Sequence, residues 1–245
     1  MNITTKPFEY KDGSTTCVGY IAWDESYASE RPCVLVAHDW RGRTAFSEEK
    51  AVQMAALGYV GIAIDVYGEG QNGASPEENA ALMQPFIDDR KKLLTRLKAA
   101  HSAAQKLDQV DADEIAIIGF CFGGLCALDL ARSGVDIKAA ISFHGLFDGH
   151  DLPAKKIKAS VLALHGWDDP MVPPAKVVDL GTELTKAGCD WQIHAYGKTS
   201  HAFTNPEAQD KKNGLMYSAL AEQRAWAAAM DLLNEKFSLH GVSDA

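Results

Sequence analysis

The sequence predicts an α/β fold, in which helices cover both faces of a mostly parallel, twisted sheet. Short apolar runs of strand length alternate along the chain with segments of helical periodicity. The 245 residues, 47% of them hydrophobic and 23% charged, are typical of a folded globular chain rather than a disordered one. Because α/β folds of this length often form one domain and no linker or repeat interrupts the pattern, we predict a single domain over residues 1–245.

The first elements are predicted from apolar runs and their boundaries. Residues 17–23 partly alternate, which favours one or two opening antiparallel strands, and residues 33–37 form an apolar run that suits a buried strand. Ser47 is a candidate N-cap for the helix that follows, and Gly58 is a candidate stop. Residues 59–65 then predict the next strand.

A glycine-rich loop is expected after Tyr67, followed by two helices. Ser75, Pro76 and Glu78 fit a capping box with proline at the first helical position. A longer helix is expected over 88–107, where leucine and alanine recur every three to four residues. We expect the loop and the short helix to lie above the site and to shape its pocket.

The second half of the chain continues the alternation. Strands are expected at 114–118, 138–143, 160–165 and 191–196, and helices at 125–131, from Pro173-Pro174 to Gly188, and at 215–237 with a stripe of Leu220, Ala227, Met230 and Leu233. Parallel strands joined in this way take right-handed crossovers, and the binding crevice lies at their carboxyl ends. The site is therefore expected at that edge of the sheet.

Charge and hydropathy exclude two classes of partner. The formal net charge is −9, and Lys and Arg do not cluster as phosphate binding requires, so we expect no nucleic-acid partner. No apolar run approaches the roughly 20 residues that cross a bilayer, so we expect no membrane span.

The cysteines do not suggest a disulfide framework. Their number is odd and their spacing is not compact, and the N-terminal segment lacks the apolar core of a signal peptide. We therefore expect a cytoplasmic protein with free thiols. The five cysteines are Cys17, Cys33, Cys121, Cys126 and Cys189.

A candidate nucleophile stands between a predicted strand and a predicted helix. Gly119-Phe-Cys121-Phe-Gly123 matches the G-x-nucleophile-x-G pattern of the nucleophile elbow, which is typical of the α/β-hydrolase fold. The turn is so tight that a Cβ two residues before or after the nucleophile would crowd it, which favours glycine at both places. The helix that begins there directs amides at the site and favours a thiolate and an oxyanion alike.

The elbow segment has one structural alternative that stays open and one other interpretation that does not fit. A glycine-rich corner with a buried structural thiol stays open on the motif alone. A dinucleotide-binding fingerprint does not fit, because it would need glycine where Cys121 stands.

An acid and a base for this nucleophile follow later in the chain, in the order that the fold requires. Asp169 lies in His165-Gly-Trp-Asp-Asp169-Pro-Met-Val-Pro173 after a predicted strand, and we prefer it to Asp168 because it stands four residues before Pro173. Loop or N-cap aspartates are the structural alternative. His201 occupies the loop between the last strand and the C-terminal helix, where the base is expected.

Two backbone amides are expected to form the oxyanion hole. Phe122 follows the nucleophile, and Trp40 lies in the loop after the strand 33–37. His38, His144 and His165 also follow strands, but no H-E-x-x-H or paired C-x-x-C motif supports a metal site, so we predict neither a metal nor a cofactor.

From V-L-V-A-H-D-W-R-G to S-H-A-F, these motifs resemble the dienelactone hydrolase (carboxymethylenebutenolidase-like) family. A cysteine nucleophile in G-F-C-F-G-G, with D-x-x-V-P and a late histidine, carries the resemblance, because most members of the wider fold use serine. The resemblance implies an α/β-hydrolase and a small ester or lactone substrate. It also implies that Asp39, at the place of the family's usual glutamate, pairs with the resting thiol.

The sequence departs from the family in what would bind a substrate carboxylate. Dienelactone-type members use two arginines there, whereas this chain has Glu69 and Asn205 at those places. Arg41 and Arg43 in the early loop are possible replacements or simply solvated side chains. Genuine dienelactone specificity is therefore not expected.

The resulting hypothesis is ester or lactone hydrolysis through a thioester on Cys121, assisted by His201 and Asp169. A lyase or transferase built on the same residues is one alternative, which labelled water would distinguish. A non-catalytic or redox-responsive binding module is the other, and it predicts binding without turnover. Oligomeric state and physiological substrate are not specified by the sequence.

Overall fold

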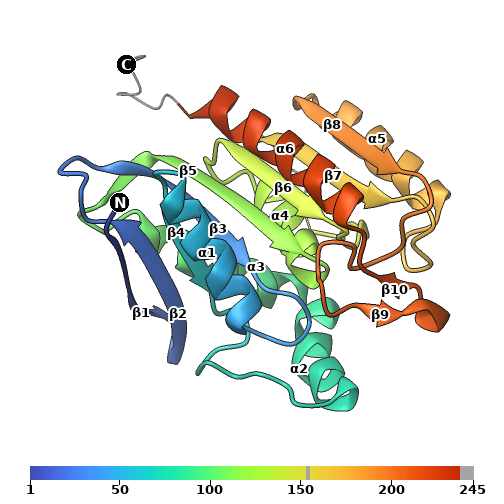
Figure 1. Ribbon diagram of the computed structural model, residues 1–245, viewed down its shortest axis with the longest axis horizontal. Helices are drawn as coiled ribbons and strands as arrows, with labels where there is room; N and C mark the ends of the chain where they lie inside the picture. Colours follow the sequence, from blue (N-terminus) through green and yellow to red (C-terminus); the bar gives the residue numbers. More distant parts are fainter. Residues whose placement is uncertain (153–154, 238–245) are drawn as a thin grey trace.

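The computed structural model confirms an α/β fold built on one eight-stranded sheet, and it describes residues 1–152 and 155–237 (Figure 1). The strand order is β1-β2-β4-β3-β5-β6-β7-β8. The strands are β1 Ile3–Asp12, β2 Thr15–Asp24, β3 Arg31–Ala37, β4 Val60–Ile64, β5 Val110–Phe120, β6 Ala139–Phe143, β7 Ser160–Gly166 and β8 Trp191–Tyr196.

Six α-helices connect or follow these strands within the described residues. They are α1 Ala45–Ala56, α2 Pro76–Asp88, α3 Arg90–Ala104, α4 Phe122–Arg132, α5 Pro174–Ala187 and α6 Ala219–Lys236. A small second sheet pairs β9 Gln209–Asp210 with β10 Leu215–Met216 around the 3₁₀ turn η1 Lys211–Asn213.

The pairing of the strands matches the expected mixture of a parallel core and an antiparallel edge. β3 pairs in parallel with β4 and β5, and the parallel ladder continues through β6 and β7 to β8. The predicted opening strands form the β1–β2 hairpin, and β2 adds antiparallel to β4. The carboxyl ends of β3, β5, β6 and β7 therefore meet at one edge of the sheet, where the site was expected.

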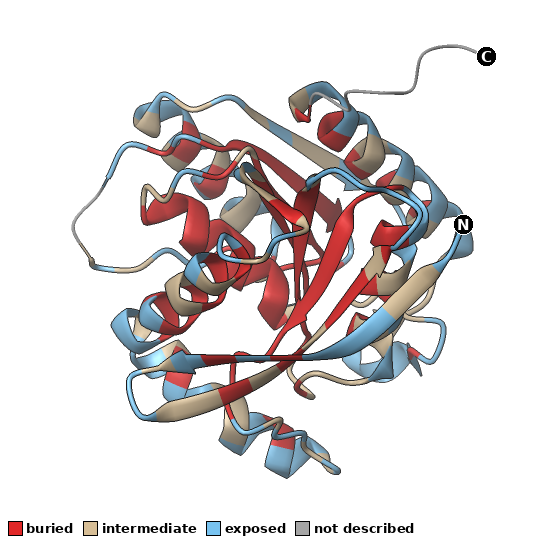
Figure 2. Ribbon diagram, turned by 90° about the vertical axis from the view of Figure 1, so that its left-hand side faces the viewer, coloured by how far each residue is buried: buried red, intermediate tan, exposed pale blue. Residues whose placement is uncertain are grey.

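Helices cover the sheet on both faces, and each face has its own apolar core. α1 and α6 pack on one face through side chains such as Met54 and Ala225, whereas α3, α4 and α5 pack on the other through side chains such as Leu97, Leu128 and Leu180. The central strands are buried along their whole length (Figure 2). Two-sided burial explains why these strands are continuous apolar runs instead of alternating ones.

Two of the predicted helix boundaries are confirmed by their capping geometry. Ser75 Oγ accepts a hydrogen bond from the Glu78 amide at 3.2 Å, and a Glu78 carboxylate oxygen accepts one from the Ala74 amide at 2.8 Å. α5 ends at Gly188 in the left-handed conformation, with φ of 65°.

The predicted start of α1 was wrong. The helix begins at Ala45 after the N-cap residue Thr44, and Ser47 lies inside its first turn, where the Oγ donates to the Thr44 carbonyl at 3.0 Å. A serine near a helix start can bond back to the preceding turn instead of capping the helix, and the sequence pattern does not distinguish the two.

The predicted start of α6 was also wrong, and its predicted stripe is confirmed at Leu233 and, partly buried, at Met230, but not at Leu220 or Ala227. Residues 215–216 form β10, which is held extended because the Met216 amide donates to the His201 carbonyl at 3.1 Å. The helix starts at Ala219, after the N-cap Ser218. Its buried face consists mainly of alanines, and Leu220 is 56% exposed.

No helix in the part of the chain that the structure describes is both long enough and apolar enough to cross a bilayer.

The close contact between β4 and α1 makes a testable prediction about stability. A Cβ on Gly61 would lie 2.0 Å from the Ala51 carbonyl oxygen, a backbone atom that only moves with the helix. Gly61→Ala should therefore lower the free energy of unfolding by about 1–3 kcal/mol, measured by urea denaturation. Gly197→Ala is the control, because no heavy atom lies within 4 Å of the added Cβ. Equal stability of the two variants would contradict the prediction.

Candidate active site

Cys121 stands at a sharp turn between β5 and α4. Its backbone has φ of 56° and ψ of −116°, in the region that side chains disfavour. A Cβ on Gly119 would lie 1.9 Å from the Gly123 oxygen, and one on Gly123 would lie 2.1 Å from the Ala37 oxygen. The need for glycine at both positions is therefore confirmed, but the clashes are with backbone across the turn and at the end of β3 and not with Cys121 as predicted.

Backbone hydrogen bonds hold this strained turn in place. The Cys121 amide donates to the Phe143 carbonyl at the end of β6 at 3.1 Å, and its carbonyl accepts from the Gly124 amide at 2.9 Å. A non-glycine residue in such a conformation costs roughly 1–3 kcal/mol and persists only where its surroundings impose it. The thiol is consequently presented at the N-terminus of α4, half-buried, at the edge of a cavity.

The structure pairs His201 with Asp169. The His201 Nδ1 lies 2.7 Å from Asp169 Oδ2, and both side chains are almost completely buried. The second oxygen, Oδ1, accepts a hydrogen bond from the Met171 amide at 2.8 Å. Asp168, by contrast, is exposed. An ionised carboxylate only accepts, so Nδ1 carries the proton.

The surroundings of His201 stabilise its charged form. Burial by itself lowers the pKa of the imidazole, but the negative charge of a Cys121 thiolate and the hydrogen bond to Asp169 outweigh burial and raise it to about 10. Its Nε2 is shielded from solvent and has no hydrogen-bond partner within residues 1–152 and 155–237. The arrangement therefore favours a protonated imidazole at His201.

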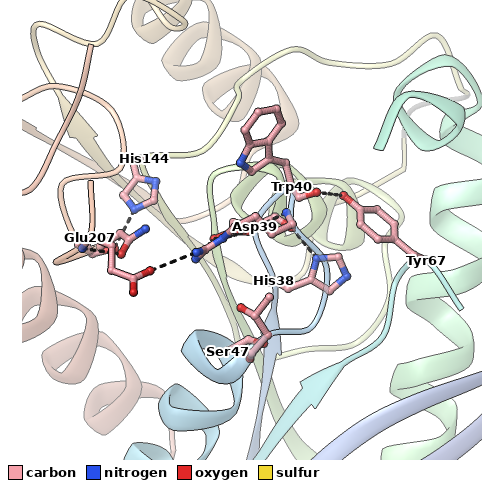
Figure 3. Close-up of polar contacts among 11 residues, drawn as sticks. His38, Asp39, Trp40, Ser47, Tyr67, His144 and Glu207 are labelled. Carbon is pink, nitrogen blue, oxygen red and sulfur yellow. Dashed lines mark hydrogen bonds and ion pairs between the residues drawn. The ribbon is translucent and has the colours of Figure 1, made fainter. Parts of the chain in front are cut away.

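The two amides predicted for an oxyanion hole lie on segments that the fold brings together. The Phe122 amide is at the start of α4, and Trp40 belongs to the loop after β3. The Trp40 amide shares its peptide with the Asp39 carbonyl, whose oxygen lies 2.6 Å from His38 Nδ1, and the Tyr67 hydroxyl donates to the Trp40 carbonyl of the next peptide at 2.8 Å (Figure 3). Neither amide donates to a protein acceptor in the described part of the chain.

Asp39 makes its contacts with Arg41. Its carboxylate accepts from the Arg41 guanidinium at 2.8 Å through Nη2 and at 3.1 Å through Nε, and from the Arg41 amide at 2.8 Å. Arg41 Nη1 then reaches Glu207 at 3.4 Å from the other side (Figure 3). No hydrogen bond joins Asp39 to Cys121 within the described residues.

A cavity of about 800 Å³ lies at the site. The loop after β3, the elbow and His201 line the cavity, and so do Pro76 and Met83 of α2, as expected for the segment after Tyr67. Much of the remaining wall comes from residues 202–215, which include the β9–β10 hairpin. The hairpin was not predicted from the sequence, in which a helix was expected from residue 215, although Asn213-Gly214 is a turn signal that could have revealed it.

A family model described as the dienelactone hydrolase family matches residues 18–237. The chain belongs to the dienelactone hydrolase family. A solved dienelactone hydrolase-like promiscuous phosphotriesterase from metagenomic libraries is 34% identical, with a TM-score of 0.93 over 97% of this chain and 100% of that one. The "Putative carboxymethylenebutenolidase" of Aquifex aeolicus is 27% identical over 228 residues, or 91% of this chain and 95% of that protein.

The predicted α/β-hydrolase fold is confirmed in the same way. An α/β-hydrolase enzyme from a Medee basin deep-sea metagenome library has a TM-score of 0.65 and 19% identity over 94% of this chain and 97% of that one. As a member of the dienelactone hydrolase family, this protein is a hydrolase.

The positions at which dienelactone-type members of the family carry arginine lie differently with respect to the cavity. Asn205 lines it, whereas Glu69 sits in a tight turn with φ of 56° and is not part of the lining. Arg43 is also directed elsewhere, because its guanidinium donates to the Val18 carbonyl and pairs with Glu48. Among the described residues that line the cavity, Arg41 is the one arginine.

The other strand-end histidines serve different contacts and form no metal cluster. No group of three or more potential ligands is present in residues 1–152 and 155–237. His38 accepts a hydrogen bond from the Val66 amide at 3.2 Å, which a charged imidazole does not do, and burial lowers its pKa. His144 lies in the cavity wall, its ring 5.2 Å from that of His201, and burial followed by the charge of His201 holds its pKa well below the usual value. The place of His144 beside His201 was not predicted from the sequence, because its position after a strand is the only signal there.

Removing the carboxylate that faces His201 should impair the site. Asp169→Asn is expected to lower kcat roughly 10²- to 10⁴-fold, because the amide neither fixes the tautomer nor stabilises the imidazolium. Steady-state kinetics on a para-nitrophenyl ester would measure the effect. Asp168→Asn, the exposed neighbour, should stay within about twofold of wild type. Equal losses in both variants would contradict the pairing.

The raised pKa of His201 predicts how the rate depends on alkaline pH. The kcat/KM value should fall as pH rises through about 10, because His201 then loses the proton that a leaving group takes. In Asp169→Asn the fall should move to lower pH, since a hydrogen bond and a negative charge that raise the pKa are gone. Circular dichroism at each pH controls for unfolding. A fall at the same pH in both proteins would argue against His201 as the titrating group.

Proposed function

We propose that this hydrolase cleaves a carboxylic ester or lactone with Cys121 as nucleophile, His201 as proton carrier and Asp169 as the group that orients His201. One observation carries the proposal. A thiol on a strained strand-to-helix turn and a histidine that shares a buried 2.7 Å hydrogen bond with Asp169 border the same cavity. A strained turn and a buried charged pair together are typical of catalytic sites and have no evident structural use here.

The reaction begins with a thiolate on Cys121 and an imidazolium on His201. The sulfur attacks the carbonyl carbon, an S–C bond forms, and the carbonyl π pair moves to oxygen. The amides of Phe122 and Trp40, which have no protein acceptor in the described chain, stabilise this oxyanion. When the tetrahedral species collapses, the C–O bond to the leaving group breaks and the alkoxide takes the proton from His201 Nε2.

Water completes the cycle. Neutral His201 takes a proton from water while the hydroxide oxygen attacks the thioester carbon, and collapse releases the carboxylic acid and restores the thiolate–imidazolium pair. A thiolate is a good leaving group, so activated esters, enol esters and lactones should react more readily than amides. The names of relatives such as the Aquifex aeolicus protein support a lactone or ester as substrate.

The family resemblance assigns Asp39 a role in the site before substrate binds. Its carboxylate accepts from the Arg41 side chain and the Arg41 amide. Pairing with the Cys121 thiol, which the family resemblance implies, therefore requires Arg41 to release one carboxylate oxygen.

A second candidate reaction is hydrolysis of phosphotriesters. It is supported by the relative that is described as a promiscuous phosphotriesterase and that is 34% identical over 97% of this chain. A neutral phosphoryl centre offers the thiolate an electrophile and develops negative charge on oxygen in the transition state, as an ester does. A phosphotriester therefore belongs in the substrate panel.

The nucleophile is tested by substitution. Cys121→Ala should lower turnover of para-nitrophenyl butyrate at least 10³-fold, because removal of the nucleophile leaves only binding and the oxyanion amides. Cys189→Ala is the matched control, since this half-buried thiol lies outside the cavity lining. Full activity of Cys121→Ala, or equal losses in the two variants, would overturn the proposal.

A further inference from the structure

The geometry points to a substrate that is uncharged and largely apolar. Arg41 is the only arginine or lysine within the described lining of the cavity, and two carboxylates already neutralise it. The cavity therefore excludes anionic esters. This inference rests on the proposed function and names the class of ester that the site accepts.

The charged side chains of the cavity wall are mostly acidic. Asp39, Glu207 and Asp210 line it together with Arg41. A Cys121 thiolate and a His201 imidazolium have no net charge as a pair. Three carboxylates therefore face one guanidinium, and the cavity has a negative potential toward anything that enters it.

Arg41 is held in place on the Asp39 side. Nε lies 3.1 Å from Asp39 Oδ1 and Nη2 lies 2.8 Å from Asp39 Oδ2, which is the two-point contact that guanidinium groups favour. The same loop adds the Arg41 amide as a third donor to Asp39 at 2.8 Å. These hydrogen bonds raise the pKa of Arg41, so the guanidinium remains charged and paired.

Glu207 occupies the remaining side of the guanidinium. Its Oε2 lies 3.4 Å from Arg41 Nη1, and the Glu207 amide donates to Asn205 Oδ1 at 3.0 Å, which fixes the backbone on that side of the cavity. The Glu207 side chain is 81% exposed. This long, exposed contact is the weaker of the two, so Glu207 is the partner whose removal frees the guanidinium.

Asp210 keeps its charge for a separate reason. Its carboxylate accepts from the Asn213 side chain at 2.6 Å and from the Asn213 amide at 3.2 Å, and these hydrogen bonds lower its pKa. It has no ion-pair partner within the described residues. An anionic substrate would meet this charge without compensation.

The rest of the wall favours an apolar substrate body. Trp40, Phe46, Met83, Leu146 and Met171 line the cavity. A carboxylate moved from water against such a surface without a cation costs far more than an alkyl group, which gains from burial. The volume of about 800 Å³ leaves room for a branched or aromatic group beside the ester.

A matched pair of esters tests the inference. The para-nitrophenyl ester of 6-methylheptanoic acid and the mono-para-nitrophenyl ester of adipic acid have the same arrangement of non-hydrogen atoms, because a carboxylate in the second takes the place of the isopropyl end of the first. Wild type should hydrolyse the neutral ester with a kcat/KM at least roughly 30-fold higher, after subtraction of the spontaneous rate. Equal values, or a preference for the adipate ester, would overturn the inference.

Glu207→Gln should lower the ratio of kcat/KM for the neutral ester to kcat/KM for the adipate ester several-fold. It should do so by raising kcat/KM for the adipate ester, because one edge of the Arg41 guanidinium then becomes free for a carboxylate. Glu9→Gln is the control, an exposed change of the same charge on β1, and it should leave the ratio unchanged. A ratio that Glu207→Gln does not move, or that both variants move equally, would contradict the role given to Arg41 and Glu207.

Failure of the proposed hydrolysis and failure of the inferred charge selection give different results. If neither ester were turned over, or if Cys121→Ala kept the activity, the proposed ester hydrolysis would fail. If both esters were turned over at equal rates by a Cys121-dependent reaction, only the inferred charge selection would fail.

Discussion

The site depends on one steric constraint, the direct contact between the first turn of α4 and the ends of β3 and β5. A side chain at Gly123 would lie 2.1 Å from the Ala37 oxygen and 2.6 Å from the His38 oxygen, so only glycine lets the helix approach this closely. The contact places the N-terminus of α4 against the loop that begins at His38. Both halves of the proposed oxyanion hole, the Phe122 and Trp40 amides, are thus positioned by the same backbone approach, and so is the strained Cys121 between them.

Charge in the site is arranged in two sets, each with two negative groups around one positive group. In the first, the negative charges of Asp169 and of the proposed Cys121 thiolate raise the pKa of the His201 imidazole although burial lowers it. In the second, Asp39 and Glu207 contact the Arg41 guanidinium. Buried charges are tolerated when they are paired in this way, and an unpaired charge brought in by a ligand is not. The same principle therefore governs the proposed chemistry and the proposed choice of substrate.

Much of this architecture followed from local sequence rules. The apolar runs at 33–37 and 160–165 identified buried parallel strands because both faces of such strands are covered, and Ser75 and Gly188 marked helix boundaries because capping is a local interaction. The chain order of nucleophile, acid and histidine pointed to Cys121 and His201, which line one cavity, and to Asp169, which pairs with His201.

What could not be predicted depends on contacts between distant segments. Residues 215–216 look helical in sequence, but they form a strand because backbone groups of His201 pair with them. The partner of Asp39 was expected to be the thiol, whereas its hydrogen bonds go to Arg41, two residues away, and the bridge to Glu207 joins residues that are far apart in the chain. Side-chain pairing across a cavity is set by tertiary structure, and no periodicity or spacing encodes it.

The proposed mechanism depends on the Cys121 sulfur as the atom that forms the covalent intermediate. Enzyme mixed with a slowly deacylating para-nitrophenyl ester, quenched in acid within the first turnover and digested at low pH, would show by mass spectrometry where the acyl group resides. We expect the mass of one acyl group on the peptide that contains Cys121. An acyl group on another residue, or substoichiometric labelling throughout a resolved burst of para-nitrophenol, would contradict the account.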